Sequence, residues 1–287
     1  MVQKKLKRGL EMKIRAILMD MDGTLLGKGQ VAVSTRNMRA VQAALKKGIH
    51  VIPCTGRVYD MLPPQLLSQE GLRYFVTSHG ANAYDLEKNE SIYTDLIPPE
   101  EASQLMKILE GKGLYNEIAA RGTVYLEEAV AKNLDMSLVP EHHVWYVRDH
   151  CYTEVSRPSE FFAKEGIGLE KMNIYNIPAH LQESIYEEVT ATGFIAHTRP
   201  GAGPHLEFSH HTLSKPRATD AILERLGVSY EETLAIGDSS SDYEIIKACG
   251  FGVAMGNAPD YIKEAADFVT DLNVNDGFAK AIEEFVL

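Results

Sequence analysis

Two aspartates stand two residues apart in this sequence, directly after a short apolar run. The run covers residues 14–19, and Asp20 and Asp22 are followed at once by Gly23 and Thr24. Such a run predicts a strand buried on both faces, as in a parallel sheet. Carboxylates at the end of a buried strand are costly unless a cation lies between them. The two aspartates therefore indicate a site for a metal and a substrate, with a solvated turn as the alternative interpretation.

Three further groups of polar residues follow predicted strands or begin a predicted helix. They are Thr55, Gly56 and Arg57 after residues 49–54, Lys215 at the start of residues 215–226, and Asp238 with Asp242 after residues 233–236. Because ligands of an open α/β sheet bind at the carboxyl ends of its strands, we expect these groups to meet at one edge. Together they offer a nucleophile, an acid or base, hydroxyl and amide donors, a lysine and carboxylates for a hard cation. This inventory suits phosphoryl transfer, in which positioning and charge neutralisation do most of the work.

Apolar strands and amphipathic helices alternate in the two outer parts of the chain. The predicted strands cover residues 14–19, 49–54, 74–77, 233–236, 252–255 and 268–270, and the predicted helices cover residues 31–48, 59–70, 215–226, 243–249 and 277–285. Ser34 or Thr35 can cap the first of these helices. The alternation predicts an α/β core with a doubly wound parallel sheet.

The pattern changes between residues 85 and 209. Strands are expected there at residues 91–97, 115–120, 123–126, 171–177, 194–199 and 205–209, and helices at residues 98–111 and 179–190. Strands that pair through hairpins indicate an α+β module with an antiparallel sheet. We therefore predict a discontinuous core domain, residues 1–84 and 210–287, with an inserted α+β domain at residues 85–209. Insertion at an exposed loop is tolerated because loop closure adds little free energy.

The composition excludes several classes of protein. The 287 residues, 45% hydrophobic and 24% charged, suffice for one large or two medium globular domains. A net charge of −11 argues against a nucleic-acid partner, which would need a basic face. Cations and amides gathered locally can still bind a phosphorylated metabolite. No apolar stretch approaches the ~20 residues that span a bilayer, so no membrane partner is expected.

The cysteines and the N-terminal residues favour a reducing compartment. Cys54, Cys151 and Cys249 are widely separated and form no Cys-x-x-Cys motif, so neither a disulfide framework nor a zinc site is indicated. Residues 1–8 are basic, but no apolar segment follows them, which argues against a signal peptide. We expect a cytoplasmic protein, monomeric or a small homo-oligomer, with a solvated N-terminal tail. Met12 is an alternative natural start.

Taken in order, the motifs resemble those of haloacid dehalogenase (HAD) superfamily hydrolases, in particular the Cof-like phosphatases that carry a large α+β cap domain. The matching segments are residues 20–26 for the first motif, 55–57 for the second, Lys215 for the third, 237–242 for the fourth and 255–258 for a downstream signature. The large insertion between the second and third motifs agrees as well. The resemblance covers nearly the whole chain from about residue 12.

This resemblance implies a role for most of the polar residues. Asp20 would attack phosphorus and become an aspartyl phosphate, and Asp22 would protonate the leaving oxygen and then activate water. The phosphate oxygens would be bound by Thr55, Gly56, Lys215 and Ser241.

The resemblance also implies Mg²⁺ as the cofactor. Its ligands would be Asp20, the backbone carbonyl of Asp22, Asp238 and waters. Asp242 would orient Lys215 or a metal-bound water. Two further supporting residues would be Asn257 and Arg57, and Arg57 is expected to be structural or to contact the cap domain.

Three residues depart from the family's pattern. Ser241 stands where the family usually has Asn, so phosphate affinity is expected to drop rather than vanish. Pro216 replaces a usual Gly after Lys215, and proline is well tolerated in the first turn of a helix. His79 replaces a usual Asn before Gly80, which bears on cap closure or substrate choice. None of these changes removes a catalytic group.

The expected function is a magnesium-dependent phosphatase for small phosphomonoesters such as sugar phosphates. The alternatives are a phosphomutase or phosphotransferase of the same superfamily, and a non-catalytic regulator that binds a phosphorylated metabolite. Candidates for contact with the leaving group are His142, His143, Trp145, Arg148, Asp149 and His150. A partly exposed helix or loop is the alternative interpretation of that cluster. We expect His205, His210 and His211 in a hinge or at the surface.

Overall fold

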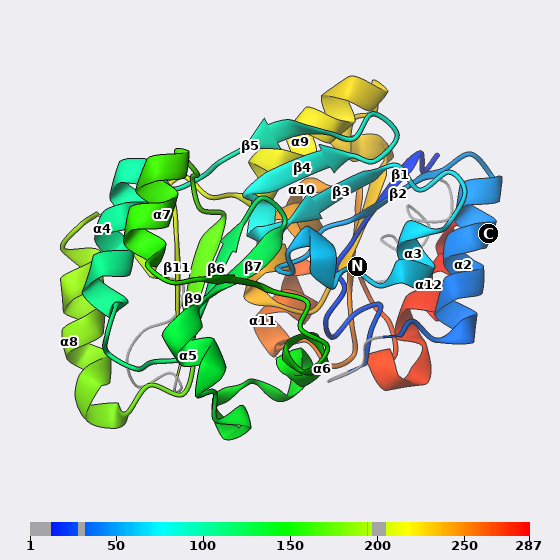
Figure 1. Ribbon diagram of the computed structural model, residues 1–287. Helices are drawn as coiled ribbons and strands as arrows, with labels where there is room; N and C mark the ends of the chain where they lie inside the picture. The colour runs from blue at the N-terminus through cyan, green and yellow to red at the C-terminus, as the bar shows by residue number, and fades with distance from the viewer. Residues whose placement is uncertain (1–12, 28–31, 194, 197–204) are drawn as a thin grey trace. The chain divides into compact units, whose positions relative to one another are not determined.

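The computed structural model describes residues 13–27, 32–193, 195–196 and 205–287, which form two compact units (Figure 1). One unit contains the described residues up to Arg57, Leu62–Thr94 and Ser214–Leu287, and the other contains Val58–Met61 and Asp95–Leu213. The expected N-terminal tail, the alternative start at Met12 and the turn at residues 200–204 lie outside the described residues.

The first unit is built on a five-stranded parallel sheet with the strand order β14-β13-β12-β1-β2. Its strands are β1(Ala16–Met19), β2(His50–Pro53), β12(Thr233–Gly237), β13(Phe251–Ala254) and β14(Phe268–Val269). Segments from the two ends of the chain therefore lie side by side, with β1 between β2 and β12 (Figure 1). This is the doubly wound α/β core that the alternating pattern predicts.

Helices cover this sheet because the residues of each strand are apolar on both faces. The helices are α2(Thr35–Lys46), α9(Lys215–Leu226), α10(Tyr243–Ala248), α11(Asp260–Ala265) and α12(Gly277–Phe285). Helix α2 packs on α12, while α9, α10 and α11 share a core with alternate strand residues such as Leu18 and Ala235. Ser34 is the residue that caps α2, since its side chain accepts a hydrogen bond from the backbone of Asn37 at 3.1 Å.

The strand expected at residues 74–77 is not part of the parallel sheet proper. It is β3(Tyr74–Thr77), which pairs antiparallel with β4(Asn82–Asp85), and β4 pairs with β5(Glu90–Thr94). A parallel bridge between Cys54 and Val76 joins β3 to the chain leaving β2, and the Thr55 amide donates to the Val76 carbonyl at 2.9 Å. This hairpin belongs to the first unit, which continues to Thr94, and the long segment of the second unit begins at Asp95.

The prediction of one helix over residues 59–70 is wrong. The segment contains a 3₁₀ turn, Tyr59–Met61, and one short helix, α3(Pro64–Leu67). Consecutive prolines at 63 and 64 explain the break, because proline disfavours helical geometry in the residue before it and donates no hydrogen bond. The 3₁₀ turn belongs to the second unit, where the Asp60 amide donates to the Gly122 carbonyl at 2.9 Å.

The second unit contains a six-stranded sheet with the order β10-β11-β9-β6-β7-β8, antiparallel except between β7 and β8. Its strands are β6(Asn116–Ala120), β7(Thr123–Glu127), β8(Thr153–Val155), β9(Lys171–Ile174), β10(Ile195–Ala196) and β11(Leu206–Ser209). Its helices are α4(Pro99–Leu109), α5(Glu128–Lys132), α6(Val144–Arg148), α7(Pro158–Glu165) and α8(Ala179–Thr190). Helices α4, α7 and α8 bury one face of this sheet in an apolar core.

The chain enters and leaves the second unit through segments that are hydrogen-bonded to each other. Asp95 begins the long segment of this unit, and its carboxylate binds His210 Nδ1 at 2.6 Å. Thr212 donates its hydroxyl to both oxygens of the same carboxylate at 2.7 Å. We call these three residues the Asp95 clasp.

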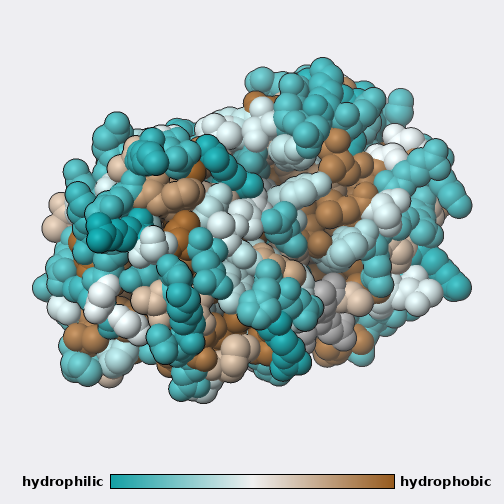
Figure 2. Space-filling model, viewed as in Figure 1, coloured by the Kyte–Doolittle hydropathy of each residue, from teal (hydrophilic) through white to brown (hydrophobic). Residues whose placement is uncertain are grey.

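Hydrophilic residues cover most of the face shown in Figure 2, and hydrophobic residues appear there in small groups. Within the described part of the chain, no helix has the length and apolar character needed to cross a membrane. All three cysteines are free thiols, and Cys54 and Cys249 are buried.

Candidate active site

A tight turn after β1 carries the first pair of aspartates. Asp20 continues the sheet, because its amide donates to the Ile236 carbonyl at 3.0 Å, and its side chain is almost fully buried. The turn then closes through the Leu26 amide, which donates to Met21 at 2.8 Å. Gly23 has a left-handed backbone with φ of 84°, and a Cβ there would lie 2.2 Å from Asp238. Only glycine fits at this approach of the two segments.

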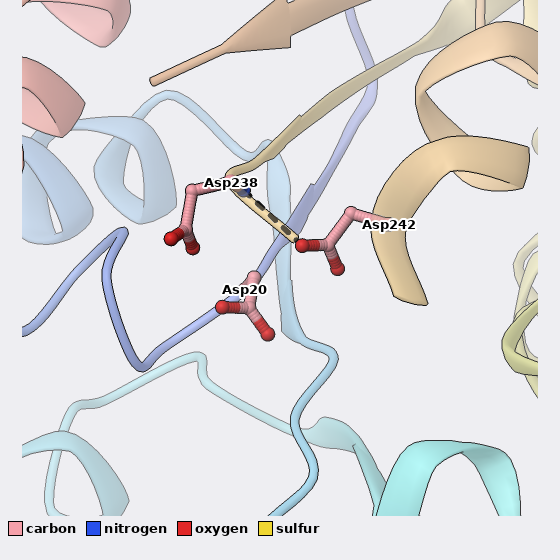
Figure 3. A group of neighbouring side chains, drawn as sticks. All are labelled: Asp20, Asp238 and Asp242. Atoms are coloured by element: carbon pink, nitrogen blue, oxygen red, sulfur yellow. Dashed lines mark hydrogen bonds between the residues drawn. The ribbon is translucent and has the colours of Figure 1, made fainter. Parts of the chain in front are cut away.

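Three carboxylates meet at the carboxyl edge of the parallel sheet. Each of Asp20, Asp238 and Asp242 places an oxygen within 4.8 Å of the other two, from the end of β1, the end of β12 and the start of α10 (Figure 3). Asp242 accepts a hydrogen bond from the Asp238 amide at 3.2 Å (Figure 3). It also accepts one from the Ser239 amide at 3.0 Å.

Asp238 is held by the turn after β1 and by a more distant loop. It accepts hydrogen bonds from the Thr24 hydroxyl at 3.0 Å and from Asn257 Nδ2 at 3.1 Å. Asn257 also donates to the Gly23 carbonyl at 2.9 Å, so it connects two of the strand ends. Ser241 lies on the same turn as Asp242, with its hydroxyl 2.9 Å from that of Ser239.

Lys215 neutralises part of this negative charge. It is the first residue of α9, it is buried, and its Nζ lies 2.7 Å from Asp242 and 3.2 Å from Asp20. Burial lowers the pKa of Lys215, but the carboxylates of Asp242 and Asp20 outweigh it and raise the pKa above its usual range. The lysine is therefore a fixed positive charge at this site.

The carboxylates carry more negative charge than one lysine balances. Burial raises the pKa of Asp20 well above its usual value, and the charges of Asp242, Asp238 and Asp22 add to the effect against the opposing charge of Lys215. Burial and the charge of Asp242 raise the pKa of Asp238 to about 6. An additional cation would relieve this repulsion.

The donor set fits a hard divalent cation. Carboxylate oxygens are the ligands that Mg²⁺, Ca²⁺ and Mn²⁺ prefer, and three of them converge here. The resemblance implies Asp20, Asp238 and the Asp22 backbone carbonyl as metal ligands, and the side chains of Asp20 and Asp238 belong to this group. Asp242 joins them in the structure, although the sequence assigned it a supporting role. The Asp22 side chain is not in this group.

Asp22 instead forms an ion pair with Arg57. The guanidinium binds both oxygens of the carboxylate, with Nε at 2.8 Å and Nη2 at 2.6 Å, and the Arg57 side chain is nearly buried while that of Asp22 is half-exposed. The sequence did not indicate this pair, since the two residues are 35 positions apart and follow different strands. A bidentate pair stabilises the ionised carboxylate, so a proton-donating Asp22 requires the pair to open.

The loop at Thr55, Gly56 and Arg57 is braced by a strained turn. The Thr55 hydroxyl accepts from the Arg57 amide at 3.1 Å. Backbone hydrogen bonds tie this loop to the next segment, from the Ser78 amide to Arg57 at 2.9 Å and from the His79 amide to Thr55 at 3.0 Å. Ser78 and His79 both have left-handed backbones, with φ of 49° and 58°. Strain of this kind persists where the surrounding contacts enforce it.

The turn at residues 78–80 also packs against Ser214, the residue that precedes α9. A Cβ on Gly56 would lie 2.4 Å from the His79 ring, and a Cβ on Gly80 would lie 2.6 Å from the Ser214 carbonyl. The turn therefore packs between the Thr55 loop and the residue that precedes Lys215. His79, which departs from the family's pattern, therefore lies beside Gly56 in the candidate phosphate-binding loop.

The histidines of the second unit occupy other environments. His143 binds Glu117 through Nδ1 at 2.8 Å, and the His205 ring stacks on Tyr175. His210 belongs to the Asp95 clasp and its ring lies 4.3 Å from that of His211. Asp149 and His150 are exposed.

A parallel doubly wound sheet with a lysine and several aspartates at its carboxyl edge is an arrangement that suits phosphoryl transfer. Residues 17–282 match the family of haloacid dehalogenase-like hydrolases. The chain belongs to this family.

Individual relatives agree with this assignment. The chain is 30% identical over 282 residues to the 5-amino-6-(5-phospho-D-ribitylamino)uracil phosphatase YcsE of Bacillus subtilis, covering 96% of this chain and 98% of that one. It is 25% identical to the pyridoxal phosphate phosphatase YbhA of Escherichia coli, covering 94% and 98% of the two chains. A haloacid dehalogenase-like hydrolase structure from Bacteroides thetaiotaomicron superposes with a TM-score of 0.79 at 25% identity, covering 94% and 99%. The resemblance stated from the motifs is confirmed.

Proposed function

We propose that this hydrolase is a magnesium-dependent phosphatase that acts on small phosphomonoesters through an aspartyl phosphate on Asp20. The observation that carries the proposal is the buried group of Asp20, Asp238, Asp242 and Lys215 at one sheet edge. The relatives named as phosphatases support the same class of reaction.

Asp20 is the nucleophile in this proposal. Its carboxylate would bond to phosphorus as the ester oxygen leaves, and water would then cleave the aspartyl phosphate and regenerate the carboxylate. Lys215, at 3.2 Å from Asp20, would hold the phosphoryl oxygens beside it by charge. Thr55 and the Gly56 amide would bind the same oxygens from the neighbouring loop. Ser241 would add a weaker hydrogen bond.

Asp22 is the acid and base. It would give a proton to the leaving oxygen and later take one from the attacking water. Arg57 holds the Asp22 carboxylate in the resting protein, so substrate binding must loosen this pair before Asp22 carries a proton. A magnesium ion held by Asp20, Asp238 and the Asp22 backbone carbonyl would supply neutralisation of the phosphoryl charge.

The test is release of phosphate from p-nitrophenyl phosphate and from a panel of phosphorylated metabolites, with magnesium and after chelation. Release that needs magnesium supports the proposal. Transfer of the phosphoryl group to a sugar without release would identify the phosphomutase or phosphotransferase alternative. Tight binding of a phosphorylated metabolite with neither release nor transfer would identify a regulator.

Replacing Arg57 by Lys is expected to lower kcat by about tenfold and to change its pH dependence, because lysine cannot bind both oxygens of Asp22. The measurement is kcat for p-nitrophenyl phosphate between pH 5 and pH 9. The matched control is Arg217→Lys, on α9 and not bonded to Asp22. An unchanged pH profile in Arg57→Lys would show that the pair does not govern Asp22.

In the metal-free protein, the protonated Asp238 side chain is expected to increase the free energy of unfolding below about pH 4. This contribution should be lost as the pH rises from about 4 to about 6. Burial and Asp242 raise the pKa of Asp238 to about 6, so the folded chain binds more protons than the unfolded chain across this range. Magnesium affinity should rise over the same range, because the metal competes with that proton. The measurement is urea unfolding with chelator at several pH values, compared with Asp238→Asn. Identical pH slopes in both proteins would contradict the prediction.

A further inference from the structure

The backbone conformation of Gly56 does not explain why this position is a glycine. Its φ lies outside the left-handed region, so other residues could adopt the same backbone. A side chain is excluded instead by His79, because a Cβ on Gly56 would lie 2.4 Å from both Cε1 and Nε2 of the ring. Glycine is needed where another group approaches the backbone this closely. The His79 ring therefore packs directly on the Gly56 backbone, and both residues belong to the first unit.

The peptide groups on both sides of Gly56 are held by hydrogen bonds. The His79 amide donates to the Thr55 carbonyl at 3.0 Å. In a trans peptide the carbonyl and the following N–H point in opposite directions, so this bond also sets the direction of the Gly56 N–H. The next peptide is held because the Arg57 amide donates to the Thr55 hydroxyl at 3.1 Å. His79 thus contributes both a backbone bond and a ring contact to the loop.

The Gly56 amide is available to a ligand. Among the residues that the structure describes, its N–H donates to no other residue, and Gly56 is partly exposed. The Thr55 hydroxyl accepts from Arg57 and still has its own proton to donate. An amide and a hydroxyl on adjacent residues match the oxygens of a phosphoryl group, and their affinity for it depends on how well their directions are fixed.

The conformation of His79 separates the role of its backbone from that of its ring. His79 has a left-handed backbone, with φ of 58° and ψ of 20°. Glycine adopts this conformation with the least strain and could make the same amide bond to Thr55. What histidine adds at this position is the ring, and the ring contacts Gly56.

The turn that carries His79 is itself braced against α9. A Cβ on Gly80 would lie 2.6 Å from the Ser214 carbonyl oxygen and 2.9 Å from the Lys215 amide nitrogen. Because the backbones touch here, the turn cannot move away from Gly56 without displacing the start of α9. The His79 ring is therefore a fixed support for the loop rather than a side chain that moves aside.

We propose that His79 is a positioning residue for phosphate binding, whose amide and ring hold the Gly56 N–H in the direction that binds a phosphoryl oxygen. The inference rests on the role proposed above for Thr55 and Gly56. Loss of the ring leaves the Gly56 peptide free to rotate, so binding of the phosphoryl group weakens in substrate and product alike. An interaction lost equally from the ground state and the transition state raises KM and leaves kcat nearly unchanged.

The test compares the wild type with His79→Gly, which fits the left-handed backbone and removes the ring. The matched control is Asn89→Gly, because Asn89 also has a left-handed backbone, with φ of 54°, in the exposed turn between β4 and β5. The binding probe is inorganic phosphate, titrated calorimetrically in the presence of magnesium. The kinetic probe is p-nitrophenyl phosphate, and thermal unfolding reports stability.

His79→Gly should raise the Kd of inorganic phosphate and KM for p-nitrophenyl phosphate about tenfold each, and should lower kcat by less than about threefold. Its thermal stability should stay close to that of the wild type, because relief of the left-handed strain offsets the lost ring contact. Asn89→Gly should match the wild type in both affinities. If His79→Gly does not fold, His79→Asn takes its place, since asparagine also tolerates this backbone.

Unchanged phosphate affinity in His79→Gly, or an equal loss in Asn89→Gly, would overturn the inference. So would a fall in kcat and thermal stability with KM unchanged, which is the result for a residue that only supports the fold. The binding arm does not depend on turnover. If no variant hydrolyses p-nitrophenyl phosphate, the phosphatase proposal fails, and the phosphate affinities still decide the role of His79.

A second comparison tests the contact between the ring and Gly56. Gly56→Ala should weaken phosphate binding about tenfold or more when His79 is present, because the new methyl group must displace the ring or the loop. The same change should have a smaller effect in His79→Gly, where the space is open, so the two substitutions should be non-additive. Additive effects on the Kd of phosphate would overturn the inference.

Discussion

An Asp20→Asn variant is expected to release phosphate from p-nitrophenyl phosphate at least about 10³-fold more slowly than the wild type. An amide oxygen is a poor nucleophile, so the aspartyl phosphate would not form. The fold should persist, because Asn has the shape of Asp and removes a charge that burial and the neighbouring carboxylates already disfavour. Steady-state kinetics and circular dichroism measure the two effects separately.

The control for this experiment is Asp260→Asn, which changes an exposed aspartate at the start of α11 in the same way. It should retain full activity. Asp20→Asn with a tenth or more of wild-type turnover would refute Asp20 as the nucleophile. Loss of activity together with loss of folded structure would also contradict the prediction, since it would show that the fold requires the Asp20 carboxylate.

A Lys215→Met variant should lose both activity and stability. Removing the lysine ammonium group leaves the buried carboxylates of Asp20 and Asp242 without their cation. Breaking a buried ion pair in this way lowers the free energy of unfolding by about 3–5 kcal/mol. Turnover should fall by about 10²-fold or more, since no fixed charge then faces the phosphoryl oxygens.

The stability loss in Lys215→Met should depend on pH and on metal. Without the lysine, the pKa of Asp20 rises further, so the folded state holds a proton that the unfolded state has released. The deficit should therefore grow as pH rises and shrink when magnesium is added. Urea unfolding at pH 5 and pH 8, with and without magnesium, measures this. The exposed Lys107→Met variant serves as the control, and a deficit independent of pH would contradict the argument.

The sequence predicts which side chains meet at the candidate active site, because parallel strands place their carboxyl ends together. Asp20 and Asp238 are 218 positions apart by their numbering, yet each follows an apolar strand, and strand-end position alone suffices to bring them together. Lys215 could be anticipated for a related reason, since it begins an amphipathic helix whose apolar stripe packs on the sheet.

Other features could not be predicted because they depend on tertiary contacts. β4 contains Asn82 and Asp85, which are rare in strands, and it pairs with β3 because a hairpin holds it there. The pair between Arg57 and Asp22 depends on the conformations of two separate turns.

The Asp95 clasp has a topological consequence. Residues 95 and 212 are far apart along the chain, but the clasp fastens the two ends of the inserted segment to each other. A segment whose ends already meet can be excised and grafted into a loop of another protein with little strain. Such a cassette would need a substitute for Val58 and Met61, whose side chains pack in its hydrophobic core from outside the segment.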